Sequence, residues 1–263
     1  GAIALTGSRL EPRFGVVSQL NSDLESNTHQ LTASFNGITT KALIFNASYT
    51  YTRSRDETQG ISTFGGFGGS GASTAGNPNF LERATSDQER RHSILGTVTW
   101  PIKPAFELTA IARLTSGGFF TPMVGGDING DGLRNDRPYI FDPATAPDTA
   151  VSNGMSRLLA AAPERAKECL DAQMGKIASR NSCSVPWRPS FDLQANLKPS
   201  FFGLNRRLTV SVQGLNTLGE IDQLLHGKDN LRGWGQPAFP DRTLLYVRGF
   251  NPATRQFQYQ VNE

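Results

Sequence analysis

The chain has 263 residues, of which 37% are hydrophobic and 19% are charged, with 27 glycines and 16 phenylalanines. This composition is too rich in glycine and polar residues for a helical bundle, and the formal net charge of +3 argues against a dedicated nucleic-acid surface. No run of about 18 apolar residues occurs, which excludes a transmembrane helix but not a membrane-spanning sheet, whose strands alternate apolar and polar residues.

Apolar and polar residues alternate with a period of two in segments of about ten residues, which predicts β-strands. The clearest segment is 190–198, where Phe191, Leu193, Ala195 and Leu197 share one face. In chain order, the predicted strands cover residues 14–20, 30–36, 41–51, 94–100, 105–115, 190–198, 207–213, 242–250 and 255–261, with 2–10 as a tenth candidate.

The connections between these strands alternate in length. Residues 37–40, 101–104, 200–205 and 251–254 form short connections, and residues 54–90, 116–189 and 217–241 form long ones. A water-soluble β-sandwich also has alternating strands, but it has no reason to keep its long loops at one end. An outer-membrane barrel does, because its periplasmic turns are short and its extracellular loops are free to grow. The pattern therefore favours an all-β fold, part of an antiparallel transmembrane β-barrel with long extracellular loops.

Aromatic and polar side chains agree with this interpretation. Trp100 lies beside a short connection, and Tyr51 and Trp187 lie toward long ones, as expected for rings at the two membrane interfaces. The alternative is that these rings belong to an ordinary core. A row of polar side chains would be costly to bury in a sandwich core but can face a watery lumen. The positions that a solute in the lumen would meet are Glu107, Arg113, Asp192, Gln194, Asn196 and Lys198.

About nine or ten strands are predicted, whereas the chain starts at Gly1 without a signal peptide and ends without a terminal aromatic residue. We therefore expect residues 1–263 to be part of a single outer-membrane β-barrel domain of a longer protein. Any plug or further N-terminal domain would lie outside this sequence.

Residues 119–138, FFTPMVGGDINGDGLRNDRP, resemble an extracellular loop of Oar-like TonB-dependent receptors, a family that often carries a carboxypeptidase-regulatory-like domain. Residues 46–52, 90–93 and 246–254 are similar to the same family, and the resemblance covers most of the chain from about residue 27 onward. It implies a barrel of about twenty-two strands with a plug and a TonB box. Neither is present in this sequence, so TonB-dependent transport and the TonB complex as a partner are implied by the resemblance alone.

The same Asp-rich segment matches the pattern D-x-N-x-D-G, in which alternate oxygen-bearing side chains surround a Ca²⁺ ion. The candidate ligands are Asp127, Asn129, Asp131, the carbonyl of Leu133, and Asn135 or Asp136. The segment is not an EF-hand, because Pro138 occupies the twelfth position, where an EF-hand requires Glu. The alternative is an Asp/Asn/Gly turn with side-chain to backbone hydrogen bonds and no ion.

Residues 152–175 have helical spacing, which predicts one short loop helix. Pro163 would interrupt it and open a second segment, and Gly175 would form the C-cap. Cys169 and Cys183 are the two cysteines, and their polar surroundings predict a disulfide formed in an oxidising compartment. The alternative is a pair of free, buried thiols.

Motifs of enzymes are not found in the sequence. His29, His92 and His226 share no metal-binding spacing, no G-x-S-x-G elbow occurs, and the Gly-rich segment 65–71 lacks the Lys-Ser/Thr of a phosphate-binding loop. The leading hypothesis is a non-enzymatic receptor that moves a substrate, such as a peptide or protein, across the outer membrane. The alternatives are an adhesion barrel whose loops bind a partner, and a secreted β-sandwich stabilised by calcium.

Overall fold

A computed structural model of the chain describes residues 13, 22–58, 73–77, 79–130, 133–199 and 207–263. The predicted strands 2–10 and 14–20, the connection 200–205 and the Gly-rich segment 65–71 lie outside these residues. None of the helices in the described residues is long and apolar enough to cross a membrane.

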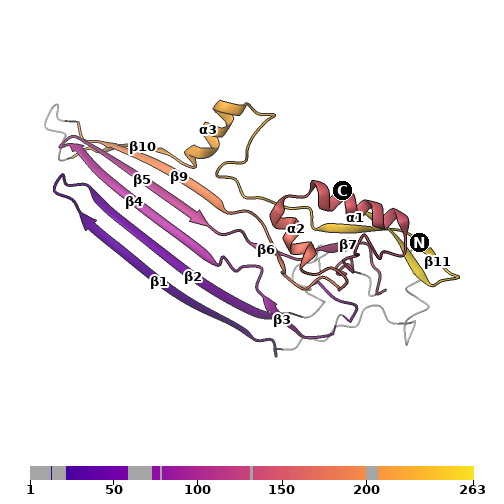
Figure 1. Cartoon of the computed structure of the whole chain (residues 1–263). Helices are drawn as coiled ribbons and strands as arrows, with labels where there is room; N and C mark the ends of the chain where they lie inside the picture. The colour runs from indigo at the N-terminus through magenta and orange to yellow at the C-terminus, as the bar shows by residue number, and fades with distance from the viewer. Residues whose placement is uncertain (1–12, 14–21, 59–72, 78, 131–132, 200–206) are drawn as a thin grey trace.

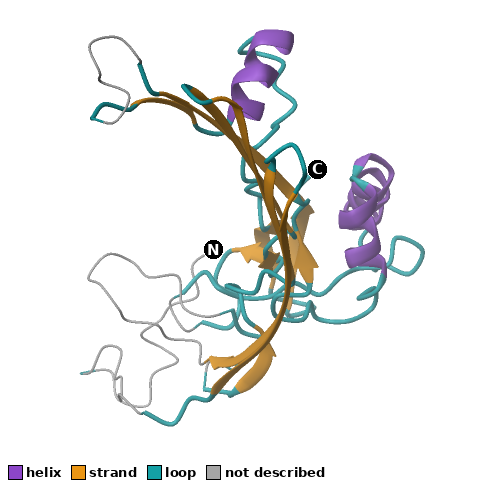
Figure 2. Ribbon diagram, turned by 90° about the vertical axis from the view of Figure 1, so that its left-hand side faces the viewer, coloured by secondary structure: helices purple, strands orange, loops and turns teal. Residues whose placement is uncertain are grey.

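The main feature is a long antiparallel sheet, which we call the wall (Figure 1). Its strands pair in the order β1-β2-β4-β5-β9-β10, and β3 pairs with the end of β2. Figure 2 shows the wall bent into an arc. The bounds are β1 (Ser26–Ile38), β2 (Ile44–Thr58), β3 (Glu82–Thr85), β4 (His92–Lys103), β5 (Phe106–Thr115), β9 (Arg188–Leu197) and β10 (Val210–Gly214).

The register of the wall gathers the apolar side chains on one face, because paired residues of adjacent strands point to the same side. Along one row, Tyr49 pairs with Ile94, and Ile94 pairs with Leu114. Along another, Val98 pairs with Ala110, and Ala110 pairs with Leu193. The faces predicted from the period of two are confirmed. The row-forming residues on the apolar face include Leu31, Phe35, Phe45, Ala47, Tyr51, Gly96, Trp100, Leu108, Ala112, Phe191, Ala195, Val210 and Val212.

This apolar face is not covered by the described part of the chain. Leu31 is 71% exposed, Phe35 67% and Val212 68%. Exposing so many large apolar side chains to water is unfavourable by about 25 cal/mol per Å², whereas the same face suits lipid. Since the described residues place no second sheet against it, a β-sandwich does not account for the wall.

A second, smaller unit lies at one end of the wall, and we call residues 116–187 and 242–263 the loop module (Figure 1). Its buried core is formed by Ile140, Val151, Met155, Leu170, Ala178, Leu244, Leu245 and Val261. The hydrophobic core of the described residues therefore belongs to the module and not to the wall. The module contains β6 (Phe119–Phe120), β7 (Met123–Gly125), α1 (Thr149–Ala161), α2 (Glu164–Asp171), β8 (Cys183–Ser184), β11 (Thr243–Asn251) and β12 (Gln256–Val261).

The hairpin of β11 and β12 has the predicted strands, but it does not extend the wall. β11 pairs in parallel with β7, and α1 packs against β12. The nine or ten strands predicted from the sequence include the two strands of this hairpin. Its turn at residues 251–254 does not join two strands of the wall. Alternation specifies a strand with one buried face, and it does not specify which sheet the strand joins.

Helices differ from the prediction in number and in bounds. The described residues contain three helices, where the sequence predicts one helix with a second segment after Pro163. The second segment is α2, and Pro163 is its N-cap. Gly175 is not the C-cap, which is Ala172, and instead lies in the following turn with φ of 77°. The third helix, α3 (Thr217–His226), falls within a segment that the sequence predicts to be loop.

Candidate functional site

The face of the wall opposite the apolar one carries a network of polar side chains. Arg113 forms an ion pair with Asp192, and Asn196 donates to Glu107 at 2.9 Å. Further along this face, Thr32 and Thr50 are 3.0 Å apart, as hydroxyl partners across β1 and β2. The structure therefore brings together five of the six positions predicted to face a lumen. Arg113 pairs with Asp192, and Glu107 pairs with Asn196, whose Oδ1 also accepts from Gln194 Nε2 at 2.9 Å.

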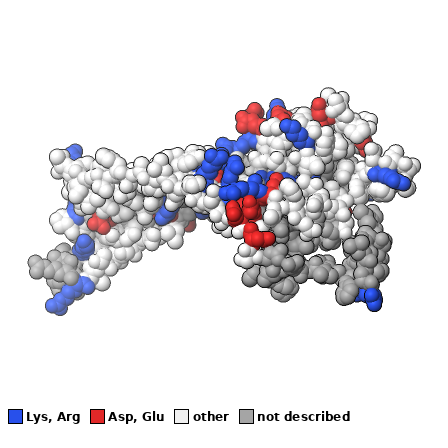
Figure 3. All heavy atoms as spheres, turned by 90° about the horizontal axis from the view of Figure 1, so that it is seen from below, with Lys and Arg blue, Asp and Glu red and all other residues white. Residues whose placement is uncertain are grey.

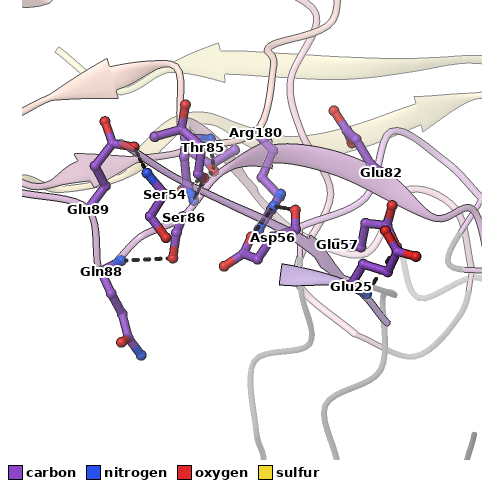
Figure 4. A network of polar contacts seen from close by, with 12 residues as sticks. Glu25, Ser54, Asp56, Glu57, Glu82, Thr85, Ser86, Gln88, Glu89 and Arg180 are labelled. Carbon is purple, nitrogen blue, oxygen red and sulfur yellow. Dashed lines mark hydrogen bonds and ion pairs between the residues drawn. The ribbon is translucent and has the colours of Figure 1, made fainter. Parts of the chain in front are cut away.

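The wall and the loop module meet in a network of polar contacts (Figure 4). Arg180 of the module donates from Nη2 to the main-chain carbonyl of Asp56 at 2.6 Å and also forms an ion pair with the Asp56 carboxylate. Asp56 lies near the end of β2, and the Arg180 side chain is only 6% exposed. This contact joins residues 124 positions apart in the sequence.

Two neighbouring side chains extend the junction. Asn181 donates from Nδ2 to the carbonyl of Thr85 on β3 at 2.7 Å, and the Thr121 hydroxyl donates to Asn181 Oδ1 at 3.1 Å. Glu89, whose side chain is 1% exposed, accepts from the Ser54 backbone N–H at 2.6 Å and pairs with Arg91 at 2.8 Å. These contacts satisfy buried polar groups, which would otherwise be costly.

On the face seen in Figure 3, charged side chains gather near the middle of the molecule and are sparser along the wall. Arg137 of the module adds a bidentate pair with Glu82 on β3, with N–O distances of 3.1 and 2.5 Å. Two parallel N–H···O bonds are the geometry in which guanidinium and carboxylate interact most strongly. The junction is thus held by two buried arginines, Arg137 and Arg180, each paired with a carboxylate of the sheet.

Two adjacent pockets, which we call the junction cleft, open where the wall meets the module. The larger has a volume of about 640 Å³ and the smaller about 240 Å³, and Asp87 and Arg242 line both. The charged residues of the larger pocket are Asp56, Asp87, Arg134, Arg180 and Arg242. The smaller pocket adds Arg90 and Arg188.

The predicted disulfide between Cys169 and Cys183 is present, with a Cα–Cα distance of 5.4 Å. It joins α2 to β8, which in turn pairs with β6 through Phe119 and Phe120. The cross-link therefore lies inside the module, between a helix and a strand that border its core. Cys183 is buried, with 4% of its surface exposed.

The Asp-rich loop uses part of its oxygen atoms for hydrogen bonds to the backbone. Asp127 Oδ1 accepts from the Gly130 N–H at 2.7 Å, and Asp136 Oδ2 accepts from the N–H groups of Ile128 and Asn129 at 2.7 and 3.3 Å. Asp131 lies outside the described residues. In the described part of the chain, no three His, Cys, Asp or Glu residues are close enough to hold a metal ion. The loop contacts fit the ion-free turn, and the calcium site stays a prediction.

A second polar cluster organises the segment after α3. Asp222, 1% exposed, accepts from the N–H groups of Arg232 and Trp234 at 3.0 Å each, and its Oδ1 lies 2.8 Å from His226 Nδ1. Burial opposes ionisation of Asp222, but these hydrogen bonds outweigh it and hold its pKa below the usual value. His226 is therefore a partner of a buried carboxylate.

Sequence reasoning missed the junction. No pattern links Arg180 to Asp56 or Arg137 to Glu82, because each pair joins segments that meet only in the folded chain.

The comparison with protein families gives one match. A family model described as "Outer membrane beta barrel domain" matches residues 2–219, which is most of the chain and includes every strand of the wall. No curated protein and no solved structure matches the chain.

Proposed function

Because the chain belongs to the outer membrane beta barrel domain family, we propose that it serves as part of an energised transport barrel that moves a solute across the outer membrane. The family places the protein in the bacterial outer membrane, with lipid around the barrel. The apolar face of the wall then meets lipid, and its polar face lines the lumen. The loop module lies at the end of the wall that carries the long connections, which is the extracellular end in such barrels.

The observation that carries the proposal is the position of the junction cleft. The cleft lies between a wall whose polar face can line a conduit and a folded module at the end of that wall. A barrel with a purely structural role in the membrane would not need a charged cleft at its opening. Coupling to the TonB complex rests on the resemblance of residues 119–138 to Oar-like receptors, and it would act through a region outside this sequence.

Uptake in cells tests the transport proposal. Cells that carry the gene should accumulate labelled oligopeptides from the medium faster than cells that lack it, and a protonophore or loss of TonB should abolish the difference. Uptake that persists without the proton-motive force would contradict energised transport. Equal uptake with and without the gene would contradict transport of peptides.

The alternative function is adhesion, in which the module binds a surface or another cell. The observation that favours it is the size and packing of the module, which has its own hydrophobic core and disulfide. Attachment of cells to a surface should then depend on the module and be unaffected by a protonophore. The same inhibitor therefore distinguishes the two functions.

A calcium ion in the Asp-rich loop is a further proposal, supported by the spacing of Asp127, Asn129 and Asp131. The Leu133 carbonyl and Asp136 would complete the ligand set. Hard oxygen ligands of this kind suit Ca²⁺, which would stiffen the loop without taking part in transport.

A further inference from the structure

We propose that the junction cleft binds an oxyanion-bearing solute of short-peptide size. The carboxylates of the solute would bind the arginines that line the cleft. This inference rests on the proposed function, because it names the class of solute that the barrel would receive. A pocket of about 640 Å³ falls in the size range of sites that hold a small ligand.

The charge of the cleft is the first argument. Five arginines line its two pockets against two aspartates, and Asp56 is already paired with Arg180. Among the described residues, the guanidinium groups of Arg134, Arg188 and Arg242 form no ion pair, and all three residues are exposed. The cleft therefore has a positive excess that an anionic solute would neutralise.

The second argument is a buried donor that lacks an acceptor. Arg180 lines the larger pocket with its side chain 94% buried, and its Nε–H has no hydrogen-bond partner among the residues that the structure describes. The hydroxyl of Ser73, on the same pocket, is also buried without a partner there. Buried polar groups are nearly always paired in native proteins, so two such groups on one pocket point to an acceptor supplied by a ligand.

The third argument is that one arginine of the smaller pocket is held in place. Arg90 Nη1 donates to the carbonyls of Asp87 and Glu89 at 3.0 and 2.9 Å. A Cβ atom on Gly118 would lie 2.7 Å from that nitrogen, so the glycine leaves room for the guanidinium. Arg90 is thereby fixed at the pocket, and its remaining donors suit a planar oxyanion.

The lining is not wholly polar. Met123, Val124 and Tyr246 form an apolar part of the larger pocket, beside the arginines. A bare inorganic ion would gain nothing from these side chains. A peptide with acidic and aliphatic residues would use both parts, which is why we assign the cleft to a solute of that kind.

Isothermal titration calorimetry on the full chain in detergent tests the assignment. The probes are a tetrapeptide of two Glu and two Leu, the same peptide with Gln in place of Glu, and inorganic phosphate. We expect the acidic peptide to bind at least about ten-fold more tightly than the amide peptide. Arg242→Gln and Arg134→Gln should each weaken its binding by about ten-fold, since each removes a charge-assisted contact.

The matched control is Arg165→Gln, which removes the same charge from an exposed position on α2 outside the cleft. It should leave binding unchanged. Equal affinity for the acidic and amide peptides would overturn the inference, and so would an equal loss in Arg165→Gln and Arg242→Gln. Phosphate binding as tight as that of the acidic peptide would overturn the assignment to a peptide. An unchanged shift in gel mobility on heating confirms that each variant is folded.

The two proposals fail separately. The inference about the cleft alone would be overturned by two results together. The purified protein would not bind the acidic peptide, and cells that carry the gene would still take up neutral peptides in an energised way. Binding without energised uptake would overturn the transport function alone.

Discussion

Arg180 of the loop module and Asp56 of the wall form a buried ion pair in which the arginine also donates to the Asp56 carbonyl. Asp56 is on a strand that crosses the wall, and Arg180 follows the segment that closes the module core at Ala178. The pair therefore fixes the position of the module over the end of the wall, and with it the shape of the junction cleft.

Asp56→Asn should loosen the module from the wall. Removing the carboxylate charge leaves Arg180 buried without its counter-ion, at a cost of about 3 kcal/mol. Hydrogen exchange should then speed up at residues 178–184 and 82–89, with little change in β4 and β5. The control is Glu263→Gln, which removes the pair with Arg157, a side chain that is 63% exposed. If both variants exchange like the unmodified protein, the pair does not hold the junction.

Loss of the disulfide should destabilise the module and leave the wall intact. Cys169 and Cys183 are 14 positions apart, and closing a loop of this length stabilises the folded state by about 3 kcal/mol in the chain-entropy model. We expect Cys169→Ser with Cys183→Ser to make the module sensitive to limited proteolysis between residues 149 and 184. The shift in gel mobility on heating should persist, and its loss would show that the module and the wall do not fold separately.

Adjacent positions on β4 provide a matched test of the two faces of the wall. Val98 lies on the apolar face, 39% exposed, and Thr97 lies on the polar face. Arginine on the lipid side of a barrel costs about 2–4 kcal/mol near the middle of the bilayer, so Val98→Arg should reduce the amount of folded protein in the outer membrane. Thr97→Arg should be tolerated. The opposite result, measured by heat-dependent gel mobility, would reverse the assignment of the faces.

Asp222 should make the segment after α3 sensitive to acid. Its pKa is lowered in the folded state, so the folded protein binds a proton less readily than the unfolded chain. The stabilisation is complete above the usual aspartate pKa of about 3.9 and is lost as the pH falls through the lower folded value. The protection factors of residues 217–236, which are exchange rates corrected for their intrinsic pH dependence, should fall in that window and should not change with pH in Asp222→Asn.

Calcium, if it binds, should raise the thermal stability of the loop that contains Asp127. Asp127→Ala should remove the difference between melting temperatures measured with Ca²⁺ and with a chelator. The variant also loses the hydrogen bond from Gly130, so the comparison must be between the two conditions and not with the unmodified protein alone. An unmodified protein that melts at the same temperature in Ca²⁺ and chelator would exclude the ion.

The strands of the wall other than β3 could be predicted because each has one apolar and one polar face, which the period of two records directly. The strands β3, β6, β7 and β8 could not, since two to four residues are too few to show a period. α3 was missed because Gly219 and the buried Asp222 interrupt a stripe formed by Leu218, Ile221 and Leu225. The disulfide was predicted from two cysteines and their polar surroundings, whereas the cleft depends on five arginines that are spread along the chain.

The separate location of the hydrophobic core has a calorimetric consequence. A protein absorbs extra heat on unfolding in proportion to the apolar surface that passes into water. Met155, Leu245 and Val261 are buried in the core and become exposed to water on unfolding. Phe35 and Val98 are not buried in the protein, because they face lipid or detergent in the folded state. The heat-capacity step of a melt in detergent should therefore be much smaller than a chain of this length suggests, and it should report the module.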